Sequence, residues 1–333
     1  MKKKIKTLII AEAGVNHNGS LELAKKMISE ASKAGADYIK FQIFSPNELC
    51  TSYAKKPDYA KHVKVKSQLN MLKKLALNIK DFYNLKKYCK KKKIGFLVSV
   101  FDNTSLFLFK KLKLNTLKIP SGEINNIPFL RLAGSLKKNI ILSTGMASLK
   151  EIKNAVAILV SNGTKKKKIS ILQCTTNYPS SYKELNLKAI KLFKKKFKVK
   201  VGFSDHSLGI EASIAAVALG AEIIEKHFTL NKFYKGPDHQ ASLSVKELID
   251  LVKSIRNVEY ALGQEKKFLS IIEKKNMTIV RKSIVAKKRI LKGEYFSTKN
   301  LTTKRPATGK SPVMWDKIIG KKAKKNYSID QQI

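Results

Sequence analysis

Cysteine is scarce in this 333-residue chain. The three cysteines, Cys50, Cys89 and Cys174, lie far apart and form no C-x-x-C spacing. An odd number of scattered cysteines excludes the disulfide framework of a small secreted protein, so we expect a reducing, cytoplasmic compartment.

Long apolar runs are missing as well. No run approaches the roughly 18 residues that a membrane-spanning helix requires. The opening MKKKIKTLIIAEAG offers only Leu8, Ile9 and Ile10 before Glu12 interrupts it, which is too short for a signal peptide. We therefore expect no membrane partner.

Acidic residues are few, 24 against 68 basic ones, which gives a net charge of +44. Such a charge raises nucleic acid as a partner, because clustered cations bind phosphates and release counterions. However, only five of the basic residues are arginine, and the lysines are spread along the chain instead of alternating with aromatic residues. The pattern favours lysines on solvated helix faces and no nucleic-acid partner. A basic polyanion-binding protein remains the noncatalytic alternative.

Short apolar, β-branched runs recur through the first 230 residues, each followed by a lysine-rich amphipathic stretch. The eight strands predicted from these runs are Thr7–Ala13, Tyr38–Phe44, Gly95–Phe101, Thr116–Pro120, Asn139–Thr144, Ile169–Thr175, Lys200–Asp205 and Glu222–Phe228. Four intervening segments have apolar residues at the spacing of helices that face a sheet: Leu21–Ala34, Asp81–Lys92, Leu149–Ser161 and Leu208–Leu219. Eight βα units predict an α/β fold, a closed (β/α)8 TIM barrel.

The βα alternation stops after about residue 263. A charged connector near Ser270–Met277 leads into a segment in which Gly293, Gly309 and Gly320 punctuate short strands and turns. We predict a barrel domain at 1–266, a linker at 267–278 and a small compact domain at 279–333.

Nearly every predicted strand ends in polar residues. These residues are Glu12, Lys40, Gln42, Ser99, Asp102, Lys118, Ser121, Ser143, Thr175, Asp205, His206, Lys226 and His227. Because a barrel's active site is assembled from strand C-terminal ends and the loops after them, we expect these residues to meet at one rim. Each one alone is also compatible with an ordinary strand-end polar residue.

Two histidines lie at equivalent ends of the seventh and eighth predicted strands, His206 in GFSDHS and His227 in IEKHFT. Imidazoles from neighbouring strands predict a divalent metal site with positions left for water and substrate, with Mn²⁺ preferred over Zn²⁺ or Fe²⁺. The alternative is that each histidine donates to a backbone carbonyl. His17 in VNHNG either lines the site or shapes a turn, and His239 in KGPDHQAS is placed to approach the substrate.

Lys40 and Lys118 are embedded in otherwise apolar strands, YIKFQIF and TLKIPSG. A buried ammonium group is costly unless it meets a fixed anion, which predicts a phosphate or carboxylate pocket. The alternative is a structural ion pair with Glu12, Glu123 or Glu225 inside the barrel.

Short glycine motifs follow two of the predicted strands. Ser121–Gly122 in IPSGE and Ser143–Gly145 in LSTGM supply hydroxyl groups and backbone N–H groups that can surround phosphate oxygens. Beside the two lysines, they support the prediction of an anion pocket.

Several segments together resemble a known family from end to end. They are AEAGVNHNG, KFQ, KIPSGE, LSTGM, CTTNYP, GFSDHS, EKHFT, GPDHQASL and KRPATG, and their number, order and spacing resemble the sialic acid synthase family. The resemblance implies a TIM barrel followed by a small antifreeze-protein-like (SAF) domain, in a domain-swapped homodimer whose small domain covers the partner's barrel mouth. It also implies an enzyme, a transferase that forms a C–C bond between phosphoenolpyruvate and an N-acetylated mannose-type sugar.

The same resemblance assigns roles to single residues. His206 and His227 would bind the metal, commonly manganese, and Glu123 would lie near the metal and its water. The residues that would hold phosphoenolpyruvate are Lys40, Lys118, Ser121, Ser143 and Ser204. The residues that would surround the sugar are Glu12, Gln42, Tyr178 and Asp238, with Arg305 of KRPATG reaching from the partner subunit to the N-acetyl group.

One position departs from the pattern of synthases dedicated to N-acetylneuraminate, which often have Asn where this chain has Thr176. CTTNYP, ELNLKAI and LTTKRPA look more like the family members that make legionaminic acid from 2,4-diacetamido-2,4,6-trideoxymannose. The resemblance therefore favours that sugar. N-acetylneuraminate synthesis from N-acetylmannosamine and pseudaminate synthesis are the alternatives.

Overall fold

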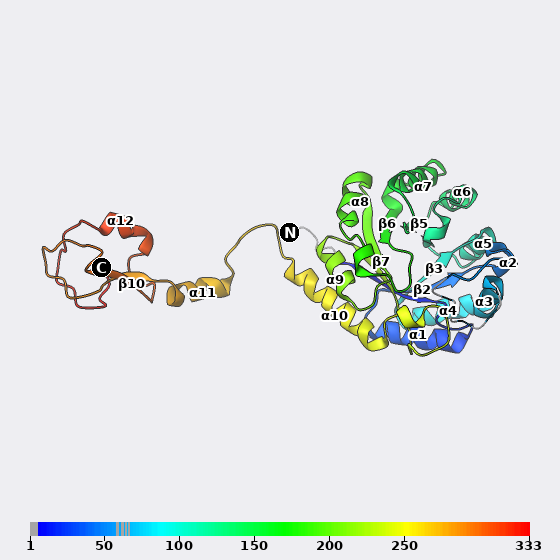
Figure 1. Ribbon diagram of the computed structural model, residues 1–333, viewed down its shortest axis with the longest axis horizontal. Helices are drawn as coiled ribbons and strands as arrows, with labels where there is room; N and C mark the ends of the chain where they lie inside the picture. The colour runs from blue at the N-terminus through cyan, green and yellow to red at the C-terminus, as the bar shows by residue number, and fades with distance from the viewer. Residues whose placement is uncertain (1–5, 58–59, 61–62, 64, 66) are drawn as a thin grey trace. The chain divides into compact units, whose positions relative to one another are not determined.

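A computed structural model describes residues 6–57, 60, 63, 65 and 67–333. The chain divides into two compact units, Met1–Gly263 and Gln264–Ile333, and each is described by itself (Figure 1). Among the described residues, no helix has both the length and the apolar character needed to cross a membrane.

The first unit is a closed barrel in which strands β1 to β8 pair in sequence order (Figure 1). The strands are β1 Leu8–Gly14, β2 Tyr38–Ile43, β3 Gly95–Val100, β4 Thr116–Ile119, β5 Asn139–Ser143, β6 Ile169–Cys174, β7 Lys200–Asp205 and β8 Ile223–His227. The recorded pairs of neighbouring strands are parallel, and β1 pairs with β8 to close the ring. The prediction of a TIM barrel is confirmed.

Helices alternate with these strands. The helices of the first unit are α1 Leu21–Lys33, α2 Pro46–Leu49, α3 Gln68–Leu75, α4 Ile79–Lys91, α5 Asn103–Lys111, α6 Ile127–Ser135, α7 Leu149–Ser161, α8 Ala189–Phe197, α9 Glu211–Ala218 and α10 Val245–Ala261. Helix α7 has the predicted bounds, because Ser148 and Glu151 form a capping box at its start. Helix α9 begins three residues later than predicted, at Glu211, after Gly209 with a left-handed φ of 70°.

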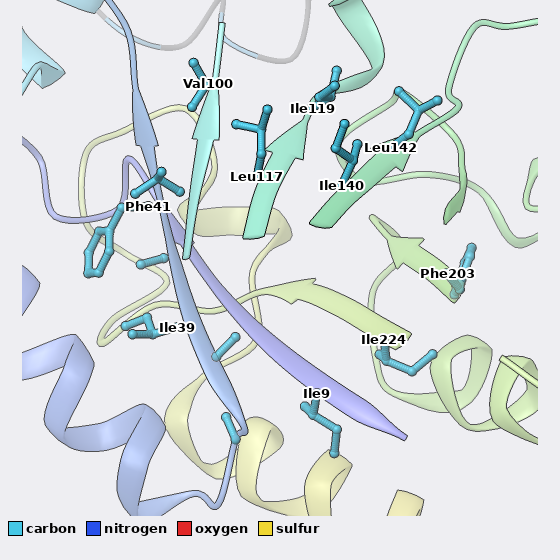
Figure 2. Packing of buried hydrophobic residues seen from close by; sticks show 14 of the residues in the cluster. Ile9, Ile39, Phe41, Val100, Leu117, Ile119, Ile140, Leu142, Phe203 and Ile224 are labelled. Carbon is cyan, nitrogen blue, oxygen red and sulfur yellow. The ribbon is translucent and has the colours of Figure 1, made fainter. Parts of the chain in front are cut away.

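Alternation along the strands separates two packing regions. Ile39, Leu117, Leu142 and Phe203 belong to the large core cluster between the barrel and its helices, and Figure 2 shows members of this cluster. A second cluster fills the barrel interior near the strand N-termini, and its buried members are Ile10, Leu97, Ile141, Leu172 and Ile223. Towards the strand C-termini the inward-facing side chains are polar. The site therefore lies next to the apolar cluster that fills the other end of the barrel.

Gly202 of β7 shows how tightly the interior is packed. A Cβ atom at this position would collide with Ile223 O and would lie 2.6 Å from Leu172 Cδ2. Only glycine therefore lets these strands approach with the interior side chains in place.

The second unit is small. It contains helix α11 Ile271–Val280, the antiparallel strands β9 Ser283–Ala286 and β10 Leu301–Lys304, and helix α12 Trp315–Ile318. Its own core includes Ile284, Ile290, Phe296 and Tyr327. Helix α11 occupies most of the predicted linker at 267–278, and the domain boundaries of the sequence analysis stay a prediction.

Candidate active site

A cavity of about 440 Å³ opens at the C-terminal ends of the barrel strands. The residues predicted from the sequence that line it are Glu12, Lys40, Gln42, Ser99, Lys118, Ser121, Glu123, Ser143, Thr176, Tyr178, Ser204, His206, His227 and Asp238. The barrel thus brings together side chains from all around its rim.

A buried cluster of four charged side chains forms the floor of this cavity. The ammonium group of Lys40 lies 2.9 Å from Glu12 Oε2 and donates to Ser99 Oγ at 2.6 Å. Glu225 Oε1 lies 3.6 Å from Lys40 Nζ and 3.3 Å from Lys118 Nζ. The alternative of ion pairs inside the barrel is therefore observed for Glu12 and Glu225. The ammonium groups also line the cavity, and the anion pocket stays a prediction.

The lysines and carboxylates shift one another's protonation. Burial raises the pKa of Glu12 to about 7, although the ammonium of Lys40 opposes this shift. Burial alone would raise the pKa of Glu225, but the ammonium groups of Lys118 and Lys40 lower it to about 2. Burial lowers the pKa of Lys118, whereas the Glu12 and Glu225 carboxylates outweigh burial and raise the pKa of Lys40.

Glu225 was missed as a site residue by the sequence analysis, which named it only as an ion-pair partner. Its carboxylate touches both lysines and accepts a hydrogen bond from Ser204 Oγ at 3.0 Å. Its position in the sequence could have identified it as a site residue. Glu225 lies two residues before His227 in the same strand, and such positions face the same side of a sheet.

His206 and His227 lie side by side above this floor, with ring centroids 5.7 Å apart. His206 Nδ1 donates to Thr175 O at 2.7 Å, so the lone pair of the neutral ring lies on Nε2. Burial lowers the pKa of His206, but Cys174 and the Thr175 carbonyl outweigh burial and raise it. Tyr178 packs against the His206 ring at 4.1 Å between centroids. The predicted pair of histidines is therefore brought together at the mouth of the barrel.

The two imidazoles fit a catalytic metal site. His227 Nδ1 is buried and has no hydrogen-bond partner in the described part of the chain. Burial, followed by the nearby His206 and Lys40, lowers the pKa of His227 well below its ordinary value, so this imidazole is neutral as a metal ligand must be. No group of three or more His, Cys, Asp or Glu side chains suited to a metal occurs within residues 6–57, 60, 63, 65 and 67–333, so further ligands would come from water or substrate.

Backbone geometry makes room beside His227. Gly14 has a left-handed φ of 52°, and a Cβ atom there would lie 3.1 Å from His227 Cε1 and 3.4 Å from Gln42 Nε2. Asp238 Oδ2 lies 3.9 Å from His227 Nδ1. Gly14 thus lets β1 approach the rings that define the mouth.

The serine and glycine motifs that were predicted to surround an anion line the same cavity as the lysines. Ser121 Oγ accepts from the Gly145 N–H at 2.9 Å, and a Cβ atom at Gly145 would collide with Thr176 Oγ1. Ser143 Oγ is buried without a hydrogen-bond partner among the described residues. A buried hydroxyl left unpaired costs free energy, so Ser143 is prepared for a ligand.

Glu123 ends the short 3₁₀ helix Ser121–Glu123 and lies at the rim of the cavity. Asn126 Nδ2 donates to its carboxylate at 2.6 Å. Burial raises the pKa of Glu123 despite this hydrogen bond, which makes its carboxylate a stronger base than an exposed one.

Some predicted rim residues point elsewhere. Asp102 caps α5 through Ser105 N at 2.7 Å, and Thr175 Oγ1 donates to Glu184 O at 3.0 Å. Asp205 and Lys226 pair with each other at 2.8 Å, outside the set of residues that line the cavity. The expectation that these four side chains meet at the rim is wrong, because strand-end position alone does not decide which way a side chain faces.

His17 and His239 form hydrogen bonds within the loops that follow β1 and β8. His17 Nδ1 accepts from Gly19 N at 3.1 Å, which shapes the turn after β1. His239 contacts Thr229 Oγ1 at 2.7 Å and Asn18 Oδ1 at 3.2 Å, and neither histidine lines the cavity. Arg305 lies in the second unit, directly after β10, with an exposed side chain.

A parallel eight-stranded barrel with a polar mouth of this kind defines a TIM-barrel enzyme. The NeuB family profile matches residues 27–267 and the SAF domain profile matches residues 281–333, and the chain belongs to the NeuB family.

Known relatives agree with this assignment. The chain is 52% identical over 330 residues to the N,N'-diacetyllegionaminic acid synthase of Campylobacter jejuni. The alignment covers 98% of this chain and 99% of the relative. It is 40% identical to the N,N'-diacetyllegionaminic acid synthase of Legionella pneumophila, with 96% of this chain and 91% of the relative covered.

A solved structure extends the comparison. The N-acetylneuraminic acid synthetase of Leptospira borgpetersenii aligns with a TM-score of 0.73 and 37% identity, over 82% of this chain and 90% of that chain. The predictions of an enzyme of the sialic acid synthase type and of a SAF domain are confirmed.

Proposed function

We propose that the chain is a nonulosonic acid synthase that condenses phosphoenolpyruvate with 2,4-diacetamido-2,4,6-trideoxymannose to give N,N'-diacetyllegionaminic acid and phosphate. The observation that carries the proposal is one cavity with two buried lysines on its floor and two adjacent histidines at its mouth. The identity of 52% to a legionaminic acid synthase supports the choice of sugar. N-acetylneuraminate and pseudaminate synthesis are the alternatives.

Phosphoenolpyruvate carries a phosphate and a carboxylate, and the floor offers matching groups. Lys40 and Lys118 are positioned to bind its negative charge, with the hydroxyl groups of Ser121, Ser143 and Ser204 as donors. The unpaired Ser143 Oγ gains a partner when this substrate binds. Both ammonium groups remain in contact with the phosphate as it leaves and stabilise its charge.

The sugar reacts as its open-chain aldehyde. The enol carbon of phosphoenolpyruvate forms the new C–C bond to the aldehyde carbon, whose oxygen takes up a proton. Glu123 gives that proton to the aldehyde oxygen and recovers one from the water that adds to the cationic carbon left behind. The second proton of the water leaves with the phosphate as the C–O bond breaks and the ketone forms. Glu12, Gln42, Thr176, Tyr178 and Asp238 line the cavity around the sugar.

His206 and His227 would hold a divalent ion, with Mn²⁺ as the proposed metal. Bound there, the ion would supply Lewis-acid stabilisation of the negative charge on the aldehyde oxygen. The Thr175 carbonyl fixes the His206 ring in the orientation and tautomer that a metal ligand needs.

The proposal includes a cytoplasmic homodimer in which Arg305 of one subunit reaches the sugar in the other. Ile271, Ile272 and Ile279 of α11 are 77%, 71% and 68% exposed, which supports an additional protein surface against this helix. Covering the mouth with a second subunit would also exclude bulk water from the reaction.

The test is mass spectrometry of the products formed from phosphoenolpyruvate, Mn²⁺ and each candidate sugar in parallel. We expect N,N'-diacetyllegionaminic acid from the diacetamido sugar. Phosphoenolpyruvate labelled with ¹⁸O at the bridging oxygen should deliver the label to phosphate, because the C–O bond breaks. The absence of a nonulosonic acid with every sugar would refute the function.

A further inference from the structure

The cavity has two chemically different sides. The lysines, serines and histidines described above lie within β2, β3 and β4 or at the ends of β4, β5, β7 and β8. A second part of the lining, here called the apolar wall, lies beyond the C-terminal ends of β1, β2 and β3 and consists of Val15, Phe44, Leu49, Met71, Leu72, Leu75 and Phe101. These residues follow β1, β2 and β3 or lie on α2 and α3.

Packing and hydrogen bonds hold the apolar wall in place. Phe44 and Phe101 pack edge to face with centroids 6.2 Å apart. Asp102 Oδ2 accepts from Ser45 N at 2.7 Å, which ties the start of α2 to the end of β3. Glu48 of α2 accepts from Thr104 Oγ1 of α5. The wall is therefore a preformed surface.

Polar groups are few among the described residues of the apolar wall and its helices. Among the described residues of α2, α3 and the segments joining them to the barrel, Gln68 and Cys50 are the polar side chains that line the cavity. A hydroxyl or acetamido group pressed against Met71, Leu72 and Leu75 would lose its hydrogen bonds to water and gain few in return. An alkyl group would lose nothing and would remove apolar surface from water.

The proposed chemistry decides which end of the sugar reaches the wall. The aldehyde carbon has to lie next to phosphoenolpyruvate, whose charged groups belong with the lysines and serines of the floor. The opposite end of the open chain then extends away from those groups. In a 6-deoxy sugar this end is a methyl group, whereas the acetamido groups require polar partners.

We infer that the apolar wall is the subsite for the deoxygenated C6 end of the sugar and that it selects 6-deoxy substrates over 6-hydroxy ones. The inference rests on the proposed function and adds the structural origin of its specificity. An apolar pocket discriminates one small group by a factor of about 10 to 200 in kcat/KM, so we expect a preference in that range.

The experiment compares 2-acetamido-2,6-dideoxymannose with N-acetylmannosamine, which differ only at C6, using the full-length enzyme with phosphoenolpyruvate and Mn²⁺. The measured quantity is the ratio of the two kcat/KM values. This ratio does not depend on the fraction of enzyme that is folded, because both sugars are assayed with the same preparation. A third assay with the 2,4-diacetamido-6-deoxy sugar separates the contribution of C4.

The matched variants are Met71→Gln and Met71→Leu. Glutamine keeps the length of methionine and adds an amide that can pair with a 6-hydroxyl group, so the ratio should fall towards one. Leucine keeps the wall apolar at nearly the same volume, so the ratio should stay within about threefold of the native ratio.

Three outcomes separate the two proposals. Equal kcat/KM for the two sugars with the native enzyme overturns the inference and leaves the synthase function standing. A kcat/KM ratio that Met71→Gln leaves unchanged also overturns the inference, because the apolar wall then does not contact the C6 group. No product from any of the three sugars refutes the synthase function and the inference with it.

Discussion

At the scale of single residues, some buried polar atoms that line the cavity have no hydrogen-bond partner among the described residues. Ser143 Oγ and His227 Nδ1 are both buried without a hydrogen-bond partner among the described residues, whereas structural residues such as Asp102 accept two hydrogen bonds. Native proteins pair nearly all their buried polar groups. Ser143 and His227 also line the cavity, so these two atoms are open to substrate or metal in the proposed reaction.

His17 allows a pH prediction at the same scale. Burial lowers its pKa from 6.5 to about 4, so the folded state holds the neutral ring while the unfolded chain takes up a proton below pH 6.5. The corresponding stability is complete above pH 6.5 and is lost as the pH falls through 4, a change of about 3 kcal/mol.

Urea unfolding of native protein and His17→Asn between pH 7 and pH 4 measures this effect. The variant should be less stable at pH 7, and the difference between the two proteins should shrink as the pH falls. Two curves that run parallel across this range would exclude His17 as the titrating group.

At the scale of elements, β7 and β8 are joined by an outward-facing ion pair directly before the two histidines. Lys226 Nζ lies 2.8 Å from Asp205 Oδ2 and donates to Ser207 O at 2.8 Å. Asp205 also accepts from Ser213 Oγ of α9 at 2.7 Å. The pair thus connects both strand ends to the loop after β7, and each member is the direct chain neighbour of one histidine.

We predict that Asp205→Asn destabilises the fold by about 3–5 kcal/mol, because the buried ammonium of Lys226 loses its counter-charge. The double variant Asp205→Asn/Lys226→Met should recover part of this loss. Both variants should bind Mn²⁺ about 10 to 100-fold more weakly, because support of the histidines from behind is weakened.

Urea unfolding and calorimetric Mn²⁺ titration measure the two quantities separately. His227→Ala is the control that should abolish Mn²⁺ binding. Native Mn²⁺ affinity in a folded double variant would show that the ion pair stabilises the barrel without orienting the ligands.

At the scale of the whole molecule, the chain combines a barrel with a second unit that carries Arg305. The proposed homodimer makes each active site from the barrel of one subunit and the small domain of the other. Two inactive variants, Lys118→Met in the barrel and Arg305→Ala in the small domain, should then restore activity when they are mixed and refolded together.

In a random mixture, half of the dimers are mixed, and each contains one intact site. The expected recovery is therefore about one quarter of the native activity per subunit. Arg289→Ala, which changes another exposed arginine of the same unit, is the control and should stay active alone. No recovery in a mixture shown to contain mixed dimers would contradict the exchange of domains.

The sequence alone determined the barrel, because each strand can be recognised from a short apolar run of neighbouring residues. The β-branched runs at Tyr38–Ile43 and Gly95–Val100, and the capping box that starts α7, depend on residues that are neighbours in the chain. The histidine pair was also predictable, since equivalent ends of consecutive parallel strands must be adjacent.

Only the tertiary structure decided what each polar side chain faces. Glu225 enters the cavity, whereas Asp205 and Lys226 turn to each other outside it, although all three lie in β7 or β8. The apolar wall arises because α2 and α3 lie beside the mouth, and their sequences resemble ordinary core segments. Local pattern sets where strands and helices form, but the direction of a side chain and the neighbour that it meets depend on residues distant in the chain.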